Sequence, residues 1–189
     1  MKANSKKSIY KVTLSAIFIA LSTVLSLIKI FDPPLGGSVT LLSMLPVIMI
    51  SCMYGVRWGL VTSFVYSLGQ LLLSFGEVCS WGLTPFALIA TFLLDYILAY
   101  TVLGFAGVFA KKGITGVCLG ALIALMLRFL CHYISGVFIF DIWLPESWKN
   151  VWLYSLCYNG GFMLPETVFT IIGAFVLFKT NAVKKIMRM

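Results

Sequence analysis

The sequence predicts an all-α integral membrane protein with six transmembrane helices in one bundle. Of its 189 residues, 61% are hydrophobic and only 11% are charged, whereas soluble domains carry about 25% charged residues. The mean hydropathy of +1.04 means more apolar surface than a water-soluble fold of this size can bury, so a lipid bilayer is the natural solvent. The apolar residues form continuous runs rather than short alternating segments, which disfavours a membrane β-barrel.

Six apolar stretches are candidate membrane spans, and we assign all of them to a single transmembrane domain covering residues 1–189. They lie at about 12–31, 39–54, 58–75, 84–108, 114–140 and 151–178. The second stretch is short against the about 20 residues that a helix needs to cross a bilayer. We therefore expect this stretch to be tilted, broken or partly outside the membrane.

Each stretch has a recognisable beginning and end. The first follows a lysine-rich start, as in a signal peptide, but its apolar part is long and no small-residue cleavage site follows it, so we interpret it as a retained helix. Segments rich in glycine, proline and charge separate the stretches, as expected of turns at the membrane surface. These segments are DPPLGG (32–37), YGVRWG (54–59), FGEVCSWG (75–82), KKG (111–113) and DIWLPESWKN (141–150).

The distribution of charge predicts the orientation. Basic residues precede the first stretch, follow the last, and occupy the second and fourth connections: Lys2, Lys6, Lys7, Lys11, Arg57, Lys111, Lys112, Lys179, Lys184, Lys185 and Arg188. With six spans, all of these lie on one side. The other connections carry Asp32, Glu77, Asp141 and Glu146, with Lys149 as the main basic exception. Because lysine and arginine accumulate on the cytoplasmic side, we expect both termini there. The net charge of +8 is then explained by the basic residues on the cytoplasmic side of the membrane. We expect membrane lipid and not nucleic acid as a partner, because the sequence has no soluble segment that could carry a basic nucleic-acid-binding face.

Among the polar residues inside the last three apolar stretches, five stand out: Asp95, Arg128, His132, Asn159 and Glu166. A charge at the bilayer centre costs about 2.5–3.5 kcal/mol even on insertion scales, so these side chains must face protein or water. Arg128 could form a buried ion pair with Asp95 or with Glu166 that only fixes helix packing. Asp95 and His132 are each followed by a tyrosine, and we interpret them as ligand-binding residues in an outward-facing polar pocket.

Aromatic residues surround the expected pocket. Trp81, Trp143, Trp148 and Trp152 flank the outer ends of spans three to six, where an aromatic belt accounts for most of them. Aromatic rings beside Asp95 would also suit a flat, cationic ring compound. The five scattered cysteines show no metal-binding spacing, so we expect no metal site. We assign no catalytic residue and no cofactor, because the sequence lacks the common enzyme and nucleotide-binding motifs.

Four blocks of the sequence resemble the thiamine-specific S-components of energy-coupling factor (ECF) transporters. The blocks are PLGGSVTLLSMLPV (34–47), LLDYILAYTVLGFAG (93–107), RFLCHYISGVFIF (128–140) and YSLCYNGGFMLPE (154–166). The resemblance implies a six-helix protein of a bacterial plasma membrane that binds thiamine from outside. It also implies partner chains, namely a transmembrane T-component and two ATPase subunits, which would explain why this chain has no ATP site.

The resemblance further implies a set of binding residues. They are Asp95, Tyr96, His132, Gly136, Phe140, Tyr154 and Asn159. In the family, the acid at the position of Asp95 contacts the aminopyrimidine, the histidine closes on the ligand, and the glycine leaves room for the ring. Some relatives have tryptophan at the position of Phe140, and indole is the stronger cation–π partner. Some also have a tryptophan after the first span, which FDPPLGGS does not match.

Ala16 and Ala20 form a small-xxx-small pair in the first stretch, which lets another helix approach closely. The resemblance implies that this face docks on the T-component, while internal packing is the alternative. Three alternatives to a thiamine S-component remain at this point. They are an S-component for another vitamin or a thiamine precursor, a membrane-embedded enzyme that uses Asp95 and His132, and a purely structural membrane subunit.

Overall fold

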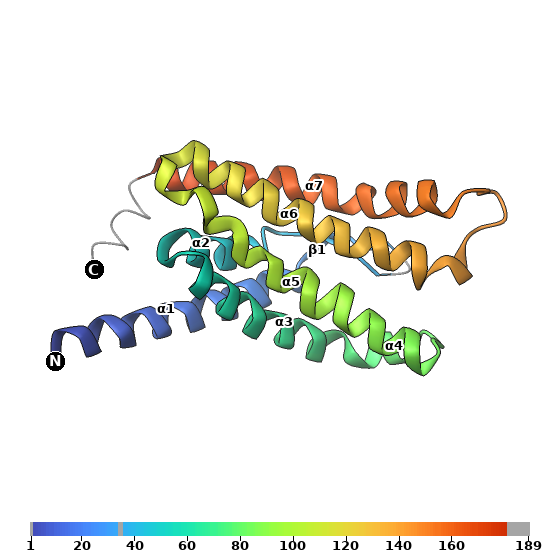
Figure 1. Cartoon of the computed structure of the whole chain (residues 1–189), viewed down its shortest axis with the longest axis horizontal. Helices are drawn as coiled ribbons and strands as arrows, with labels where there is room; N and C mark the ends of the chain where they lie inside the picture. The colour runs from blue at the N-terminus through green and yellow to red at the C-terminus, as the bar shows by residue number, and fades with distance from the viewer. Residues whose placement is uncertain (1, 34–35, 181–189) are drawn as a thin grey trace.

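The computed structural model describes residues 2–33 and 36–180, and within that part the chain is mainly helical (Figure 1). The first half contains one long helix, a small antiparallel hairpin, a short helix and a second long helix. These elements are α1 (Lys2–Ser26), β1 (Lys29–Phe31), β2 (Val39–Thr40), α2 (Leu45–Tyr54) and α3 (Val56–Cys79). The prediction of a helical protein is confirmed, and the hairpin is an addition that the sequence reasoning did not include.

The second half forms three long helical segments. The first runs through α4 (Pro85–Thr91), η1 (Phe92–Leu98), α5 (Ala99–Thr101) and η2 (Val102–Lys112). It is followed by α6 (Gly113–Phe138), the short turn η3 (Asp141–Trp143) and α7 (Val151–Lys179). In Figure 1, α6 runs beside α7 on one side and beside α5 on the other. The β2 strand of the hairpin contacts α7.

The chain reverses direction at Gly113, whose φ of 78° suits glycine. Beyond this turn, α6 packs against η2 almost backbone to backbone. A Cβ atom on Gly116 would lie 2.0 Å from the carbonyl oxygen of Phe109, and one on Gly120 would lie 2.0 Å from that of Ala106. Only glycine allows this approach, and the order of the contacts shows that the two segments are antiparallel.

Within the described residues, four helical stretches are long and apolar enough to cross a membrane: Lys7–Ser26, Val56–Cys79, Pro85–Phe138 and Val151–Lys179. The third has 54 residues and contains the reversal at Gly113. The ten-residue α2 is shorter than a span, as expected for the second stretch. Length and composition therefore support several crossings, but they do not confirm the predicted number of six.

Two predicted spans include strand residues, and α3 continues beyond its predicted end at residue 75, to Cys79. The stretch 12–31 was expected to be one helix, but α1 ends at Ser26 and the last three residues form β1. The stretch 39–54 begins with β2, and its helix starts only at Leu45, where Pro46 fits the first turn. The reason is physical: short apolar runs are compatible with either a strand or a buried helix, so hydropathy alone cannot separate the two.

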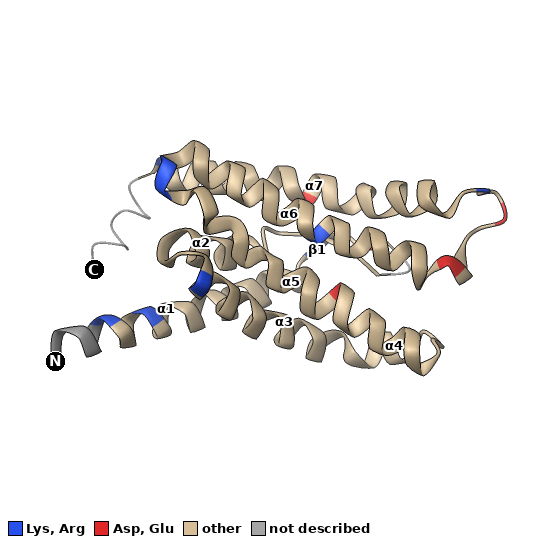
Figure 2. Cartoon of the chain, viewed as in Figure 1, with Lys and Arg blue, Asp and Glu red and all other residues tan. Residues whose placement is uncertain are grey.

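The core is centred on α2, whose residues from Leu45 to Cys52 are all buried. Ile48 and Leu103 are completely inaccessible, and Leu125 of α6 packs in the same cluster. Figure 2 shows basic residues gathered at the end of the bundle where α1 begins, and acidic residues in the connections at the opposite end. Lys184, Lys185 and Arg188, which the orientation argument also used, lie outside the described residues.

Candidate functional site

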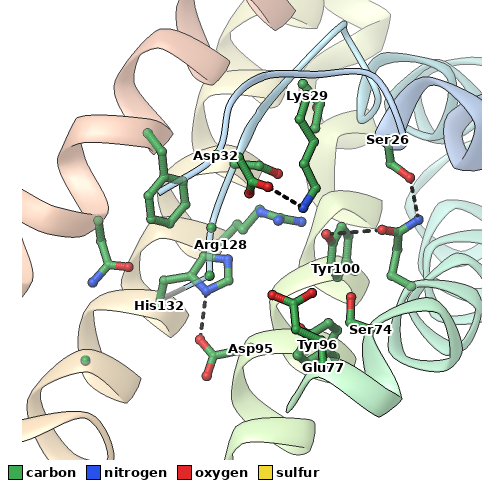
Figure 3. A pocket seen from close by; sticks show the side chains of 18 of the residues that line it. Ser26, Lys29, Asp32, Ser74, Glu77, Asp95, Tyr96, Tyr100, Arg128 and His132 are labelled. Carbon is green, nitrogen blue, oxygen red and sulfur yellow. Dashed lines mark hydrogen bonds and ion pairs between the residues drawn. The ribbon is translucent and has the colours of Figure 1, made fainter. Parts of the chain in front are cut away.

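A cavity of about 260 Å³ lies between the hairpin and the helices α3, α5, α6 and α7. All seven residues predicted to bind ligand line it: Asp95, Tyr96, His132, Gly136, Phe140, Tyr154 and Asn159. Figure 3 shows side chains from several elements pointing into this space. Residues more than 60 positions apart in the sequence thus meet in one polar cavity inside an otherwise apolar bundle.

Asp95 and His132 are joined directly. Asp95 lies in η1, a segment of π-helical turns, and such turns are frequent at functional sites. Its Oδ1 atom is 2.7 Å from Nδ1 of His132, and Ser135 donates a hydrogen bond to its other oxygen. A carboxylate only accepts hydrogen bonds, so Nδ1 of His132 is the donor. The Nε2 atom is buried and has no hydrogen-bond partner among the described residues.

Arg128 forms neither of the two ion pairs considered from the sequence. Among the described residues, Asp95 is paired with His132, and Glu166 accepts hydrogen bonds from Thr40. The guanidinium carbon of Arg128 instead lies 3.8 Å from the centre of the Tyr100 ring. Arg128 is only 6% exposed and lines the cavity. Its spacing of four residues from His132 was the available signal that it belongs to the site.

The charged residues at the mouth of the cavity were not predicted as site residues. Lys29 and Asp32 come from the hairpin and are paired at 2.8 Å, and Glu77 comes from the end of α3. From the sequence these residues resemble ordinary surface charges between spans. Together with Asp95 and Arg128 they give the lining three carboxylates and two basic side chains, besides His132. A lining with this many acidic groups suits a cationic ligand.

Aromatic rings form one wall of the cavity. Phe140 is stacked on Trp143 with ring centroids 5.3 Å apart, and Trp81 meets Phe140 edge-on at 5.9 Å. Trp81 also lies against Gly36 of the hairpin, because a Cβ atom there would be 3.0 Å from the indole ring. The segment after the first span has no tryptophan of its own, but Trp81, from the connection between α3 and α4, packs against it at Gly36.

Gly136 lies at the contact between α6 and α7, and Asn159 is hydrogen-bonded within α7. A Cβ atom on Gly136 would come within 2.3 Å of the hydroxyl oxygen of Ser155, so the glycine permits close helix contact. Asn159 donates from Nδ2 to the carbonyl oxygen of Ser155 at 3.0 Å. Gly136 was predicted to make room for a ring of the ligand. The structure adds a second requirement for glycine, the close contact with Ser155, which the sequence did not indicate.

Ala16 and Ala20 do not line this cavity. Both are exposed on α1, whereas Ser15 and Ser22 on another face of the same helix are buried. Ser15 accepts a hydrogen bond from the Trp58 indole at 2.9 Å. The face of α1 that packs inside the chain is therefore not the face that carries the two alanines.

A helical bundle with apolar outer faces and an internal cavity lined by charged and aromatic residues is typical of a substrate-binding membrane protein. The chain belongs to the thiamine transporter protein family (Thia_YuaJ), whose model matches residues 12–186. It is therefore a multi-pass membrane protein of a transporter family and not of an enzyme family, which confirms those two predictions.

Individual relatives agree with this membership. The thiamine transporter ThiT of Bacillus subtilis strain 168 is 31% identical over 191 residues, which cover 94% of each chain. The thiamine transporter ThiT of Lacticaseibacillus paracasei is 34% identical over 97 residues, covering 45% of this chain and 48% of that protein. A solved structure of ThiT from Listeria monocytogenes superposes with a TM-score of 0.76 at 25% identity, over 96% of this chain and 98% of that one.

Proposed function

We propose that this chain is the thiamine-binding S-component of an ECF-type uptake transporter. The main supporting observation is that the seven residues implied by the family resemblance line one cavity that contains three carboxylates. Thiamine carries a permanently cationic thiazolium ring and an aminopyrimidine ring with an exocyclic amine. A cavity with acidic groups and aromatic walls suits the first ring, and hydrogen-bond acceptors suit the second.

The proposed binding residues have distinct roles. Asp95 and His132 act as one hydrogen-bonded unit that recognises the aminopyrimidine. The rings of Tyr96, Phe140 and Tyr154 supply flat surfaces for stacking. Asn159 contributes an amide, and Gly136 keeps α6 and α7 close enough to form the wall; all seven line the same cavity.

We also propose that the single domain crosses the membrane six times with both termini in the cytoplasm. The antiparallel reversal at Gly113 supports the division of the stretch 85–138 into two spans. The cavity, which Asp32 and Glu77 help to line, then opens on the side of the acidic connections. Because the basic end is cytoplasmic under the positive-inside rule, thiamine enters from outside.

Docking on a T-component, with two ATPase subunits supplying energy, is the remaining part of the proposal. Ala16 and Ala20 are exposed on α1, which argues against the alternative that they serve only internal packing. Two small side chains on one lipid-facing stripe allow close approach of another helix. The sequence has no nucleotide-binding loop of its own, which agrees with a need for ATPase partners.

A fluorescence titration of the purified protein with thiamine tests the proposal. Trp81 and Trp143 adjoin Phe140 at the cavity, so a bound thiazolium should quench tryptophan emission with a dissociation constant below about 1 μM. Thiamine should be recovered chemically unchanged after incubation. Conversion of the ligand would favour the enzyme alternative, and the absence of any binding would favour a structural subunit.

A further inference from the structure

The hairpin at residues 29–40 has one exposed arm and one buried arm. The β1 residues Lys29–Phe31 are all exposed, whereas Val39 and Thr40 of β2 are only 3% and 4% exposed. Both arms contribute to the cavity lining, the second through Gly36, Gly37, Ser38 and Thr40. The shape of this wall therefore depends on what holds the second arm in place.

Three side chains spaced four residues apart on α7 hold that arm. The hydroxyl of Tyr158 donates to the carbonyl oxygen of Gly36 at 3.0 Å. The ring of Phe162 fills the space beside Gly37, where a Cβ atom would come within 2.5 Å of it. Positions spaced by four lie on one face of a helix, so α7 presents a continuous contact stripe that ends at Glu166.

Glu166 makes the strongest of these contacts. Its Oε2 atom accepts a hydrogen bond from the backbone N–H of Thr40 at 2.7 Å, and Oε1 accepts one from the Thr40 hydroxyl at 2.9 Å. Thr40 is also bonded to Ser43 at 2.6 Å. Hydrogen bonds to a carboxylate are about twice as strong as neutral ones. Glu166 is 1% exposed, and it does not belong to the cavity lining.

We propose that Glu166 is a positioning residue for ligand binding, which acts by fixing Thr40 and thereby the cavity wall formed by residues 36–40. The inference rests on the proposed function, because the ligand whose dissociation rate this wall affects is thiamine. Phe162 also connects this wall to His132, with ring centroids 5.8 Å apart. Loosening the wall should therefore release the ligand faster, without removing any group that touches it.

Glu166→Leu tests this role, and Glu166→Gln is the conservative comparison. Leucine removes both acceptors and leaves the Thr40 N–H unpaired, whereas glutamine can still accept from that N–H and donate to the hydroxyl. In stopped-flow measurements, we expect Glu166→Leu to raise the thiamine dissociation rate about tenfold or more. Glu166→Gln should stay close to the wild-type rate, and the association rate should change little in both variants.

Thr170→Val is the matched control. Thr170 lies one turn further along α7, is fully buried, and its hydroxyl has no partner among the described residues. This variant should leave the dissociation rate unchanged. Amide hydrogen exchange on the ligand-free full chain gives a second readout: Glu166→Leu should speed exchange in residues 36–40 and leave α6 unaffected.

Two outcomes would overturn the inference. One is an unchanged dissociation rate in Glu166→Leu despite faster exchange in residues 36–40. The other is an equal increase in Glu166→Leu and Thr170→Val, which would make Glu166 an ordinary packing residue. If Glu166→Leu does not fold, Glu166→Asp, whose shorter side chain cannot keep both hydrogen bonds to Thr40, should raise the rate by a smaller factor, and an unchanged rate there also counts against the inference. Absence of thiamine binding by the wild-type chain would instead overturn the proposed function itself.

Discussion

At the scale of single residues, Asp95 is the carboxylate on which the recognition of thiamine depends. Its two oxygens accept hydrogen bonds from His132 and Ser135, and its side chain is only 12% exposed. Asp95→Asn removes the charge but keeps the shape. We expect it to weaken thiamine binding by about 1.5–3 kcal/mol, the range for hydrogen bonds to a charged group, as measured by calorimetry.

The fold of this variant should survive. Arg128 does not pair with Asp95, so the substitution leaves no buried guanidinium without its counter-ion, and the amide oxygen of asparagine can still accept a hydrogen bond from His132. Asp32→Asn is the control, because Asp32 also lines the cavity but is 52% exposed and paired with Lys29. Its effect should be smaller. An unchanged dissociation constant in Asp95→Asn would leave Asp95 as a packing residue.

Phe140 provides a second test at this scale. Its ring is stacked on Trp143 and lines the cavity, so Phe140→Leu should remove one cation–π surface. The expected loss of thiamine affinity is about 0.5–2 kcal/mol, measured in the same titration. Phe138→Leu is a suitable control, because Phe138 is 67% exposed on the outer face of α6. Equal losses in both variants would contradict a specific role for Phe140.

The sequence predicted the cavity residues better than the interactions among them. Asp95 and His132 could be recognised because an ionisable group in an apolar span needs a reason to be there. Their mutual hydrogen bond could not be predicted, since it depends on how α6 meets η1. Glu77 and Lys29 were missed because charges near span ends are also typical of exposed turns.

At the scale of elements, one face of α1 packs against the rest of the chain and another face is exposed. Ser15 and Ser22 face the rest of the chain, while Ala16 and Ala20 are exposed. Leucine at position 16 or 20 adds bulk where a partner helix would need close approach. We therefore expect Ala16→Leu and Ala20→Leu proteins to bind thiamine normally, whereas cells that carry them with the full complex take up little thiamine.

This prediction requires both normal thiamine binding and reduced thiamine uptake. Normal uptake by the Ala16→Leu, Ala20→Leu double variant would contradict docking through this face. Loss of thiamine binding by either single variant would favour internal packing instead. Ile17→Leu is the matched control, because Ile17 is 55% exposed on the same helix and the change preserves its volume.

The hairpin is the element that the sequence did not predict. Its strands have only three and two residues, too few for a period-2 pattern to be recognised. Its turn region includes Gly36 and Gly37, both with positive φ, and glycines in a DPPLGG segment indicate a turn without specifying its pairing. The partner that anchors it, Glu166, is more than 120 residues away in the sequence.

At the scale of the whole molecule, composition was sufficient to predict the class. With 61% hydrophobic residues, a helical membrane protein was the only plausible architecture. The relative placement of helices was beyond the sequence, because it depends on contacts such as that of Gly120 with Ala106. The cavity is lined by residues of α3, η1, α5, α6 and α7, whereas α2 lies in the apolar core.

The most direct test of the central claim is a side-by-side calorimetric titration of the purified full chain with thiamine, riboflavin and hydroxymethylpyrimidine. The cavity combines acidic groups with aromatic walls and the Asp95–His132 unit, so it should need both rings of thiamine for tight binding. We predict a dissociation constant for thiamine below about 1 μM, and at least about tenfold weaker binding of the other two compounds. Tighter binding of riboflavin or hydroxymethylpyrimidine than of thiamine would contradict the account.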